Sequence, residues 1–409
     1  MKLLNKKSVV ITDEQQIEEF LSRGIENFYP ERETVKKALM SGKRLRIYCG
    51  FDPTAKALHI GHGIQIRKLE KLRQLGHEVI FLYGGFTAMV GDPTDKAQAR
   101  KALTASEVKT NAMGWKEQVK NIVDIKKIIF KNNHDWLSKL KFADILELTA
   151  YFTAQQMLAR DMFQKRIEEG KDLYLNEFMY PLMQAYDSVA MDVDLEIGGN
   201  DQMFNMLAGR TLMKKMKGKE KMVLTTRLLE DPSGKKMGKS EGNAISLTDS
   251  AEDMFGKVMS WPDTIITTAM EILTDISMSE IKEWEQKLAS GVNPRDGKLA
   301  LAYEVVKIYQ GETEAQKGRD YFARVFQEKE KPLEIEKVKI DLDEEEIGVL
   351  DLFVKAGLTT SNGEGRRLIT EKALRIDDKL VDVVDQKVKL SEEGLLLQRG
   401  KKQFARVVK

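Results

Sequence analysis

Cysteine is almost absent from the sequence, which has one, Cys49, among 409 residues. A single cysteine excludes an internal disulfide framework and is typical of proteins from a reducing compartment. No stretch is apolar over the roughly 18 residues that a transmembrane helix requires. Residues Met1–Val10 also contain no apolar run of signal-peptide length. We therefore expect a cytoplasmic protein without a membrane segment.

An excess of either charge is also absent, since 66 Lys and Arg face 64 Asp and Glu and leave a net charge of +2. This balance excludes a protein that is basic over its whole surface, so any nucleic-acid-binding surface must be local. The chain is long enough for two or three domains with a large core. Its first polar stretch, residues 12–41, is interpreted as helical and broken at Pro30.

Histidine is scarce, but two of the four histidines occur in one stretch, Tyr48–His62. The apolar run Leu45–Cys49 predicts a short buried strand, and the apolar spacing after the histidines predicts a helix that ends at Gly76. His59 and His62 stand at the start of this helix, where unpaired N–H groups and the helix dipole attract phosphate. A capped helix with ordinary surface histidines has the same pattern. No further ligand lies near enough in sequence to complete a metal site.

A second apolar strand, Glu78–Tyr83, follows after a short crossover, which predicts parallel pairing in a right-handed unit. The glycine-rich loop Gly84–Pro93 leaves its carboxyl end, where open parallel sheets bind ligands. Asp92 could bind an amine, and Lys96 and Arg100 could bind phosphate. A plain surface loop with solvated charges is equally consistent with this stretch.

A helical insertion is predicted over about residues 104–170. It opens with the capping box Thr104-x-x-Glu107, which predicts a helix to about Lys127. Beyond it, Asn176–Asp192 is predicted to be a largely buried helix that carries a polar stripe. The members of the stripe recur at steps of four and three, so they lie on one side: Tyr180, Gln184 and Asp187. Polar groups in a buried helix must be hydrogen-bonded, and a polar ligand is one possible partner. The more usual explanation of such a stripe is that its side chains are amphipathic and bind no ligand.

Two later loops carry further chemistry. Strand Val193–Ile197 leads through glycines to Asp201, whose carboxylate suits a ribose hydroxyl better than a phosphate. Lys221–Leu228 is predicted as the last strand of this domain. The loop that follows, 231–243, carries Lys236 and Lys239, which could clamp a triphosphate in a transition state. As a charge-rich loop alone it would be unremarkable.

In order and spacing, these motifs resemble the class I aminoacyl-tRNA synthetases, and most closely the bacterial-type tyrosyl-tRNA synthetases. His59-Ile60-Gly61-His62 matches the first family signature. Lys236-Met237-Gly238-Lys239-Ser240 matches the second, with Gly238 where serine is commonest. The resemblance covers essentially the whole chain, and further matches lie in Gly91-Asp92-Pro93, Tyr180 through Asp187, and Gly198 through Gln202.

The resemblance implies an α/β protein in three parts. A Rossmann-like catalytic domain with a parallel sheet spans 1–247 and contains the helical insertion. An all-α domain on the anticodon side spans 248–329, and a charge-dense linker spans 330–346. Residues 347–409 are similar to an α+β S4 RNA-binding domain. From Ser361 onward 12 Lys and Arg exceed 8 Asp and Glu, and the implied RNA-binding residues are Arg366, Arg367, Arg399, Lys401 and Lys402.

The resemblance also implies roles in the catalytic domain. The tyrosine-binding residues are Tyr48 and Asp187 on the phenolic hydroxyl, with Asp92, Tyr180 and Gln184 on the α-amino group. The ATP-binding residues are Cys49, Gly50, Asp52, Gly199, Asp201 and Lys239. The residues on the phosphates and the leaving pyrophosphate are Thr54, His59, His62, Lys96, Arg100, Lys236 and Lys239. Glu196 departs from many relatives, which carry glutamine there, and adds a negative charge near the pocket.

The implied reaction joins the tyrosine carboxylate to the α-phosphorus of ATP, with Mg²⁺ on the ATP phosphates and no structural metal. The 3′ end of tRNA(Tyr) then takes the tyrosyl group, and the implied assembly is a homodimer. Two alternatives remain at this point. A sister enzyme for tryptophan is disfavoured by Tyr48 and Asp187, because indole has no hydroxyl. An RNA-binding protein without catalysis is disfavoured by the intact histidine and lysine signatures.

Overall fold

The computed structural model describes residues 9–94, 103–230, 244–327, 337–340, 346–390, 394–400 and 403–408. The chain divides into two compact units, Met1–Asp320 and Tyr321–Lys409. The first unit contains a six-stranded sheet in the order β1-β6-β5-β2-β3-β4. Its strands are β1 Ile25–Tyr29, β2 Arg46–Phe51, β3 Glu78–Tyr83, β4 Ile129–Asn132, β5 Leu195–Gly199 and β6 Met222–Thr226.

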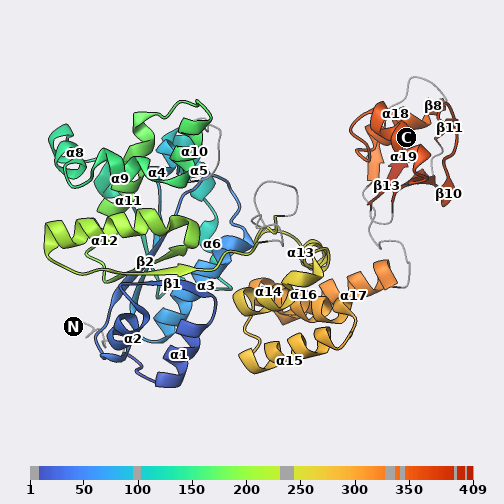
Figure 1. Ribbon diagram of the computed structural model, residues 1–409. Coiled ribbons are helices and arrows are strands. Elements are labelled where there is room, and N and C mark those ends of the chain that lie inside the picture. The colour runs from blue at the N-terminus through green and yellow to red at the C-terminus, as the bar shows by residue number, and fades with distance from the viewer. Residues whose placement is uncertain are drawn as a thin grey trace, which may run out of the picture. The chain divides into compact units, whose positions relative to one another are not determined.

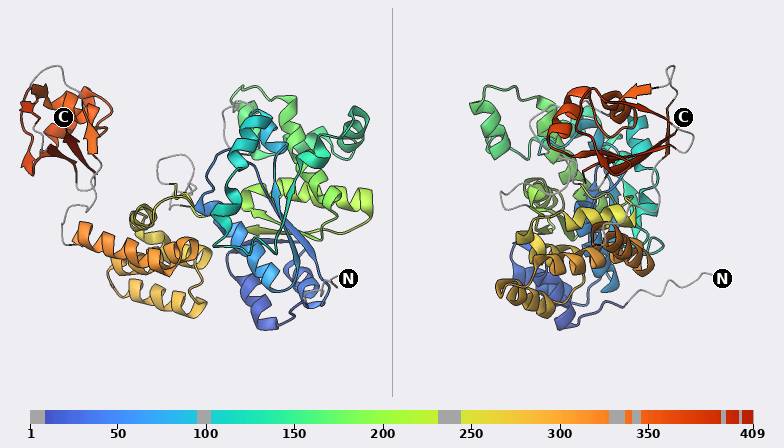
Figure 2. Two further views of the ribbon diagram at one scale, coloured as in Figure 1. Left: turned by 180° about the vertical axis from the view of Figure 1, so that it is seen from behind. Right: turned by 90° about the vertical axis from the view of Figure 1, so that its right-hand side faces the viewer.

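This sheet is parallel except for β1, which pairs antiparallel with β6. Every residue of β5 and β6 is buried, as expected for strands that are covered on both faces. The connection β2–α3–β3 runs one way along the sheet, and β5–α12–β6 runs the other way. Because such connections are right-handed, their helices α3 (Ile60–Gln74) and α12 (Met203–Lys217) cover opposite faces (Figures 1 and 2). The predicted Rossmann-like fold is confirmed.

Two strands of the sheet differ from the sequence-based interpretation. Residues 12–41 hold helices α1 (Glu14–Ser22) and α2 (Arg32–Met40), but β1 lies between them. The predicted helical insertion likewise contains β4, which pairs parallel with β3. Both strands are short and lie at the edges of the sheet, so pairing with a neighbouring strand decided their conformation, which no local pattern revealed.

The insertion is otherwise made of short helices. Its predicted capping box forms, since Glu107 N–H donates to Thr104 Oγ1 and the Glu107 carboxylate accepts from Thr104 N–H at 2.7 Å. The helix ends at Ala112 rather than near Lys127, because the next residue, Met113, adopts extended backbone, and Gly114 with φ +86° then begins a separate helix. The helices of the insertion are α5 Ala105–Ala112, α6 Trp115–Val119, α7 His134–Leu137, α8 Phe142–Thr149, α9 Ala154–Leu158 and α10 Asp161–Glu168; the short α4 (Thr87–Val90) precedes it and the longer α11 (Leu175–Met191) follows it.

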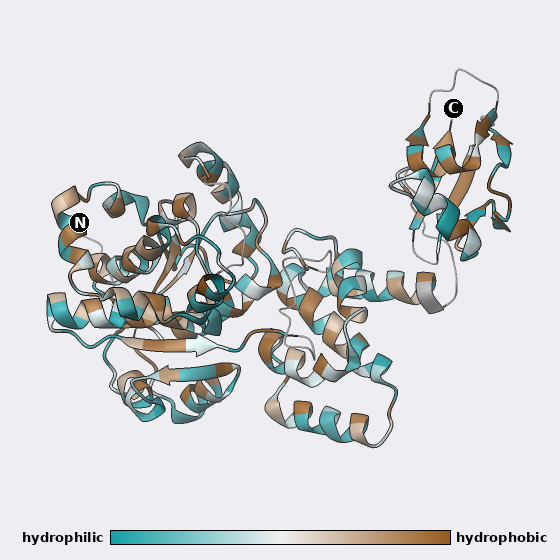
Figure 3. Ribbon diagram, turned by 45° about the horizontal axis from the view of Figure 1, so that its top comes forward, coloured by the Kyte–Doolittle hydropathy of each residue, from teal (hydrophilic) through white to brown (hydrophobic). Residues whose placement is uncertain are grey.

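A group of helices follows the sheet in the same compact unit. They are α13 Ala251–Met259, α14 Ile266–Leu273, α15 Met278–Ala289, α16 Pro294–Gln310 and α17 Glu312–Phe322, whose last two residues fall in the second unit. Figure 3 shows hydrophobic and hydrophilic turns on these helices, as expected for helices with one buried side. Among the helices of the described residues, none is both long and apolar enough to cross a bilayer.

Gly63 fixes the contact between α3 and α16. A Cβ at this position would collide with the ring of Tyr309, whose side chain is buried. We expect Gly63→Ala to lower the free energy of unfolding by about 1–3 kcal/mol through overpacking. The matched control is Gly256→Ala on α13, where a Cβ would meet nothing within 4 Å. That control should raise the free energy of unfolding by about 0.5–1 kcal/mol, because it removes a glycine from the interior of a helix. Urea midpoints of the two variants would check both signs.

The second unit is an α+β domain. Its five-stranded sheet has the order β10-β9-β12-β13-β7, and β11 pairs with β8 in a separate ribbon. The strand β7 (Lys337–Lys339) lies inside the predicted linker 330–346, and it pairs parallel with β13. The remaining elements are β8 Glu346–Gly348, α18 Val349–Lys355, α19 Asn362–Thr370, β9 Leu374–Ile376, β10 Lys379–Leu380, β11 Lys387–Lys389, β12 Leu395–Arg399 and β13 Gln403–Val408.

Candidate active site

A cavity of about 240 Å³ opens at the carboxyl ends of β2 and β5. These two neighbouring strands mark the point where the chain reverses its direction along the sheet. Open α/β sheets bind ligands at such a switch point, because the two outgoing loops diverge and leave a crevice. The cavity lining also includes residues from the first turns of α3 and from the polar side of α11.

The structure brings the predicted site residues of the catalytic domain together. Those that it describes all line this cavity: Tyr48, Cys49, Gly50, Asp52, Thr54, His59, His62, Asp92, Tyr180, Gln184, Asp187, Gly199 and Asp201. Four others lie outside the described residues: Lys96, Arg100, Lys236 and Lys239. The lining residues come from β2, α3, β5, α11 and the loop after β3. The cavity is continuous from the polar stripe of α11 to the histidines.

Asp187 forms one end of the cavity. Its carboxylate accepts hydrogen bonds from Trp136 Nε1 at 2.7 Å and from Asn133 Nδ2 at 3.1 Å, one on each oxygen. Burial raises the pKa of this carboxyl, and the two donors oppose the rise. Each oxygen keeps a second lone pair. Asp187 can therefore accept a hydrogen bond from a hydroxyl in the cavity.

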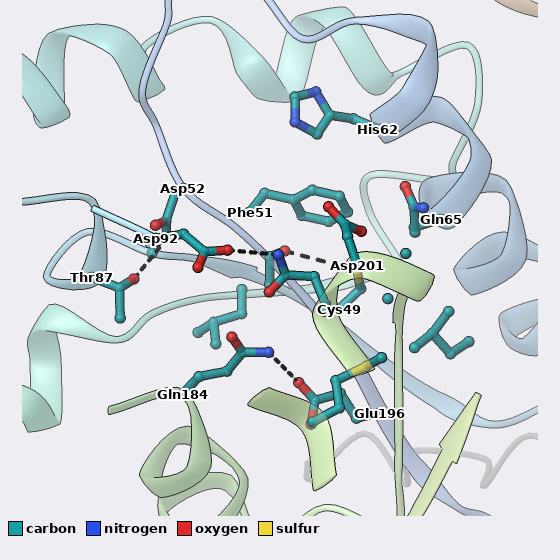
Figure 4. A pocket seen from close by; sticks show the side chains of 18 of the residues that line it. Cys49, Phe51, Asp52, His62, Gln65, Thr87, Asp92, Gln184, Glu196 and Asp201 are labelled. Atoms are coloured by element: carbon teal, nitrogen blue, oxygen red, sulfur yellow. Dashed lines mark hydrogen bonds between the residues drawn. The ribbon is translucent and has the colours of Figure 1, made fainter. Parts of the chain in front are cut away.

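A second wall of the cavity holds Asp52 and Asp92. Asp52 accepts from the Tyr180 hydroxyl at 2.9 Å and from Thr87 Oγ1 at 2.7 Å, while Gln202 Nε2 donates to Asp92 at 2.6 Å. Figure 4 shows both carboxylates beside the cavity, with Gln184 below them. Burial is the first cause that raises the pKa of Tyr180, and the charge of Asp52 adds to it. This part of the site is suited to a cationic group.

The two histidines lie at the start of α3. Their rings stack with centroids 3.7 Å apart, and His59 N–H donates to His62 Nδ1 at 3.2 Å. A short antiparallel bridge joins His59 to Ser246, and Ile60 N–H donates to Ile245 O at 2.9 Å. The segment that follows the predicted lysine loop is thereby tied to the histidine turn.

Sequence reasoning missed several side chains that shape the site. Asn133 and Trp136 follow β4, so they became visible only once β4 was recognised as a strand of the sheet. Gln65 on α3 and Gln202 also line the cavity. The charge of Glu196 is partnered too, because the buried Lys221 forms an ion pair with it. The sequence predicted an added negative charge there, whereas the structure shows a paired one.

Comparison with known proteins decides the family. Residues 40–327 match the family described as tRNA synthetases class I (W and Y), and 333–407 match the tyrosine–tRNA ligase SYY-like C-terminal domain. The chain is 40% identical over 398 residues to the tyrosine–tRNA ligase of Carboxydothermus hydrogenoformans, covering 95% of this chain and 97% of that protein. The chain belongs to the tyrosyl-tRNA synthetases. This membership confirms the predicted ligase activity and decides against the tryptophan enzyme and against an RNA-binding protein without catalysis.

Two further tyrosyl-tRNA synthetases agree with this assignment. The ligase of Thermotoga maritima is 39% identical over 400 residues, covering 97% of this chain and 98% of that protein. A solved structure of a C-terminally truncated mitochondrial tyrosyl-tRNA synthetase from Aspergillus nidulans has a TM-score of 0.64 at 26% identity. It covers 76% of this chain and 94% of that chain.

The predicted RNA-binding residues of the second unit differ in their surroundings. Arg366 and Arg367 are exposed on α19. Arg399 is half-buried, and it donates to Leu358 O and to Glu364, each at 2.7 Å. Its guanidinium therefore joins β12 to α19 within the domain. Lys401 and Lys402 lie outside the described residues.

Proposed function

We propose that the cavity holds tyrosine and ATP together, so that the tyrosine carboxylate attacks the α-phosphorus in line and pyrophosphate leaves. One observation carries the proposal: the Asp187 carboxylate and the two signature histidines line the same cavity. Positioning two reactants in one site removes most of the entropic barrier to their reaction. The tyrosyl group then passes from AMP to the 3′ end of tRNA(Tyr).

The tyrosine side chain is proposed to enter toward Tyr48 and Asp187, with its hydroxyl on both. Its α-amino group would lie at Asp92, Tyr180 and Gln184, next to the carboxylate wall. This orientation is supported by charge, because the wall suits a cation and the deeply buried Asp187 suits a neutral hydroxyl. It leaves the tyrosine carboxylate facing the histidines.

The nucleotide is proposed to lie along the carboxyl ends of β2 and β5. Cys49, Gly50, Asp52 and Gly199 would line it, and Asp201 would accept hydrogen bonds from the ribose. In the part of the chain that the structure describes, no three His, Cys, Asp or Glu side chains are grouped to hold a metal ion. We propose that Mg²⁺ arrives bound to the phosphates of ATP.

Negative charge that builds on the phosphates is proposed to be met by Thr54, His59 and His62. Lys96, Arg100, Lys236 and Lys239 would close on the pyrophosphate, and Lys239 would also contact ATP. Leu229, which shortly precedes the segment of the two signature lysines, lines the cavity. The chain returns at 244–247, beside the histidines. One flank of the lysine segment therefore borders the cavity, and the other borders the histidines.

The second unit is proposed to bind tRNA through Arg366, Arg367, Arg399, Lys401 and Lys402. Replacing Arg366 and Arg367 together with glutamine should weaken tRNA binding. The slope of log affinity against log salt should fall by about one unit for each arginine that contacts phosphate. Pyrophosphate exchange, which needs no tRNA, should not change. Arg375→Gln combined with Lys379→Gln, at exposed residues on β9 and β10, removes the same two charges as a control, and an equal effect there would contradict a specific role for α19.

We propose a cytoplasmic homodimer whose interface includes α8. Phe142 and Leu146 on this helix are 75% and 54% exposed, a large apolar area for a helix surface. Sedimentation would show a dimer that Phe142→Glu converts to monomer.

Tyrosine-dependent exchange of pyrophosphate into ATP tests the proposed first step. Tyrosine should support the exchange, and tryptophan and phenylalanine should support it far less. Equal exchange with tryptophan would contradict the proposed substrate, and exchange with none of the three would contradict the reaction.

A further inference from the structure

Lys221 is a fully buried lysine that lies behind the cavity rather than in its lining. Its exposed side-chain fraction is 0%, and that of its partner Glu196 is 2%. Burying an unpaired ammonium group would cost several kcal/mol, so the lysine needs compensation. Burial lowers the pKa of Lys221, and the carboxylate of Glu196 opposes this. An ion pair of this kind retains its charge only if its remaining hydrogen-bonding positions are filled.

All three ammonium protons of Lys221 have an acceptor. Glu196 Oε2 takes one, Ser188 Oγ at 2.9 Å takes another, and Met206 O at 3.1 Å takes the third. An ammonium group has three donors, so none is left over. Space for the group comes from Gly209 on α12, because a Cβ there would lie 2.5 Å from Lys221 Nζ. The packing therefore holds the ammonium group in one place.

The ion pair reaches the cavity by two routes. The first runs from Lys221 through Ser188 Oγ to the hydroxyl of Tyr48, 3.0 Å away. The second runs through Glu196, whose Oε1 accepts from Gln184 Nε2 at 3.0 Å (Figure 4). Tyr48 and Gln184 lie on different elements, β2 and α11, so one buried pair contacts both sides of the tyrosine site.

The direction of these hydrogen bonds follows from the donors and acceptors. Because Gln184 gives its NH₂ group to Glu196, its carbonyl oxygen is left to accept from a cation. Because Ser188 Oγ accepts a hydrogen bond from Lys221, its own proton is available to donate to the Tyr48 oxygen. The proton of Tyr48 then has two acceptors within reach, the Glu196 carboxylate, which also interacts with this hydroxyl, and a ligand in the cavity. A phenol placed there would accept from Tyr48 and donate to Asp187.

We propose that Lys221, together with Glu196, is a positioning residue that sets these hydrogen-bond directions and so makes the site selective for the hydroxyl of tyrosine. The inference rests on the proposed binding of tyrosine in the cavity. Phenylalanine would offer neither an acceptor to Tyr48 nor a donor to Asp187, and a buried group that loses a partner is costly. Lys221 would act through Ser188 and Tyr48, without contact to the substrate.

The test uses the full-length protein and three variants: Lys221→Met, Glu196→Gln, and the double variant. Lys221→Met should raise the KM for tyrosine about tenfold, the effect of roughly one lost hydrogen bond, while the KM for ATP stays within about twofold. The ratio of kcat/KM for tyrosine to that for phenylalanine should fall by about tenfold. Lys219→Met is the matched control, because Lys219 pairs with Asp192 and Asp194 away from the cavity.

The double variant separates positioning from folding. It removes both charges, so it should recover the thermal stability that either single variant loses, and it remains informative if the single variants do not fold. Under the proposal it still shows the reduced tyrosine-to-phenylalanine ratio. A double variant with the wild-type ratio would overturn the proposal, as would an equal rise in the KM values for tyrosine and ATP. Absence of tyrosine-dependent exchange in the wild-type protein would instead overturn the proposed function.

Discussion

Replacing His62 with alanine is expected to lower the kcat of tyrosine-dependent pyrophosphate exchange by about 10²–10³-fold. The His62 ring lies at the start of α3, where it is stacked on His59 and faces the cavity. Under the proposed function it donates to phosphate oxygens as their charge builds, so its loss should act on the transition state more than on bound substrates. The KM values for tyrosine and ATP should change little.

A histidine on the surface supplies the control. His134→Ala removes an exposed imidazole on α7 and should leave kcat unchanged. His62→Gln keeps a hydrogen-bond donor and should retain more activity than His62→Ala. A His62→Ala variant with wild-type kcat would contradict a role at the phosphates. The same comparison at Lys239, whose loss should also reduce kcat, would test the second signature.

Replacing Asp187 with alanine is expected to reduce the preference for tyrosine over phenylalanine by about 10- to 100-fold, the value of one buried acceptor of about 1–3 kcal/mol. Asp187 is 2% exposed and takes one donor on each oxygen, from Asn133 and Trp136. The variant removes the acceptor for the substrate hydroxyl, which phenylalanine lacks, so the fall in kcat/KM for tyrosine should exceed the fall for phenylalanine. Exchange rates with both amino acids would measure it.

The conservative variant isolates the negative charge. Asp187→Asn keeps an acceptor oxygen but loses the charge. Its preference for tyrosine over phenylalanine should therefore lie between that of the wild type and that of Asp187→Ala. Circular dichroism should confirm that the variants remain folded. An unchanged preference in folded Asp187→Ala would mean that another group reads the phenolic hydroxyl.

Much of the central sheet could be predicted because its strands are continuous apolar runs. Each end of β2, β3, β5 and β6 lies within two residues of the strand expected from its run. Edge strands β1 and β4 could not be predicted, since tertiary pairing decided them. Asn133 and Trp136 could not be predicted as site residues for the same reason, because their positions depend on the pairing of β4 with β3.

The buried pair shows a second limit of sequence reasoning. Lys221 looks like a polar residue that opens a strand, and Glu196 looks like a substitution that charges the pocket. They meet because β5 and β6 are neighbours in the sheet, with Glu196 opposite Val223. Their sequence separation of 25 residues gives no local signal. The first signature motif predicted two histidines that line the cavity, whereas the buried pair behind the cavity became visible only in three dimensions.

A crystal structure with a non-hydrolysable tyrosyl-adenylate analogue would test the central claim most directly. We predict that its phenolic oxygen lies within about 3.2 Å of Asp187 and Tyr48, that its ribose lies at Asp201, and that its phosphate mimic lies beside His59 and His62. An analogue bound outside this cavity, or bound with its adenosine at Asp187, would contradict the account.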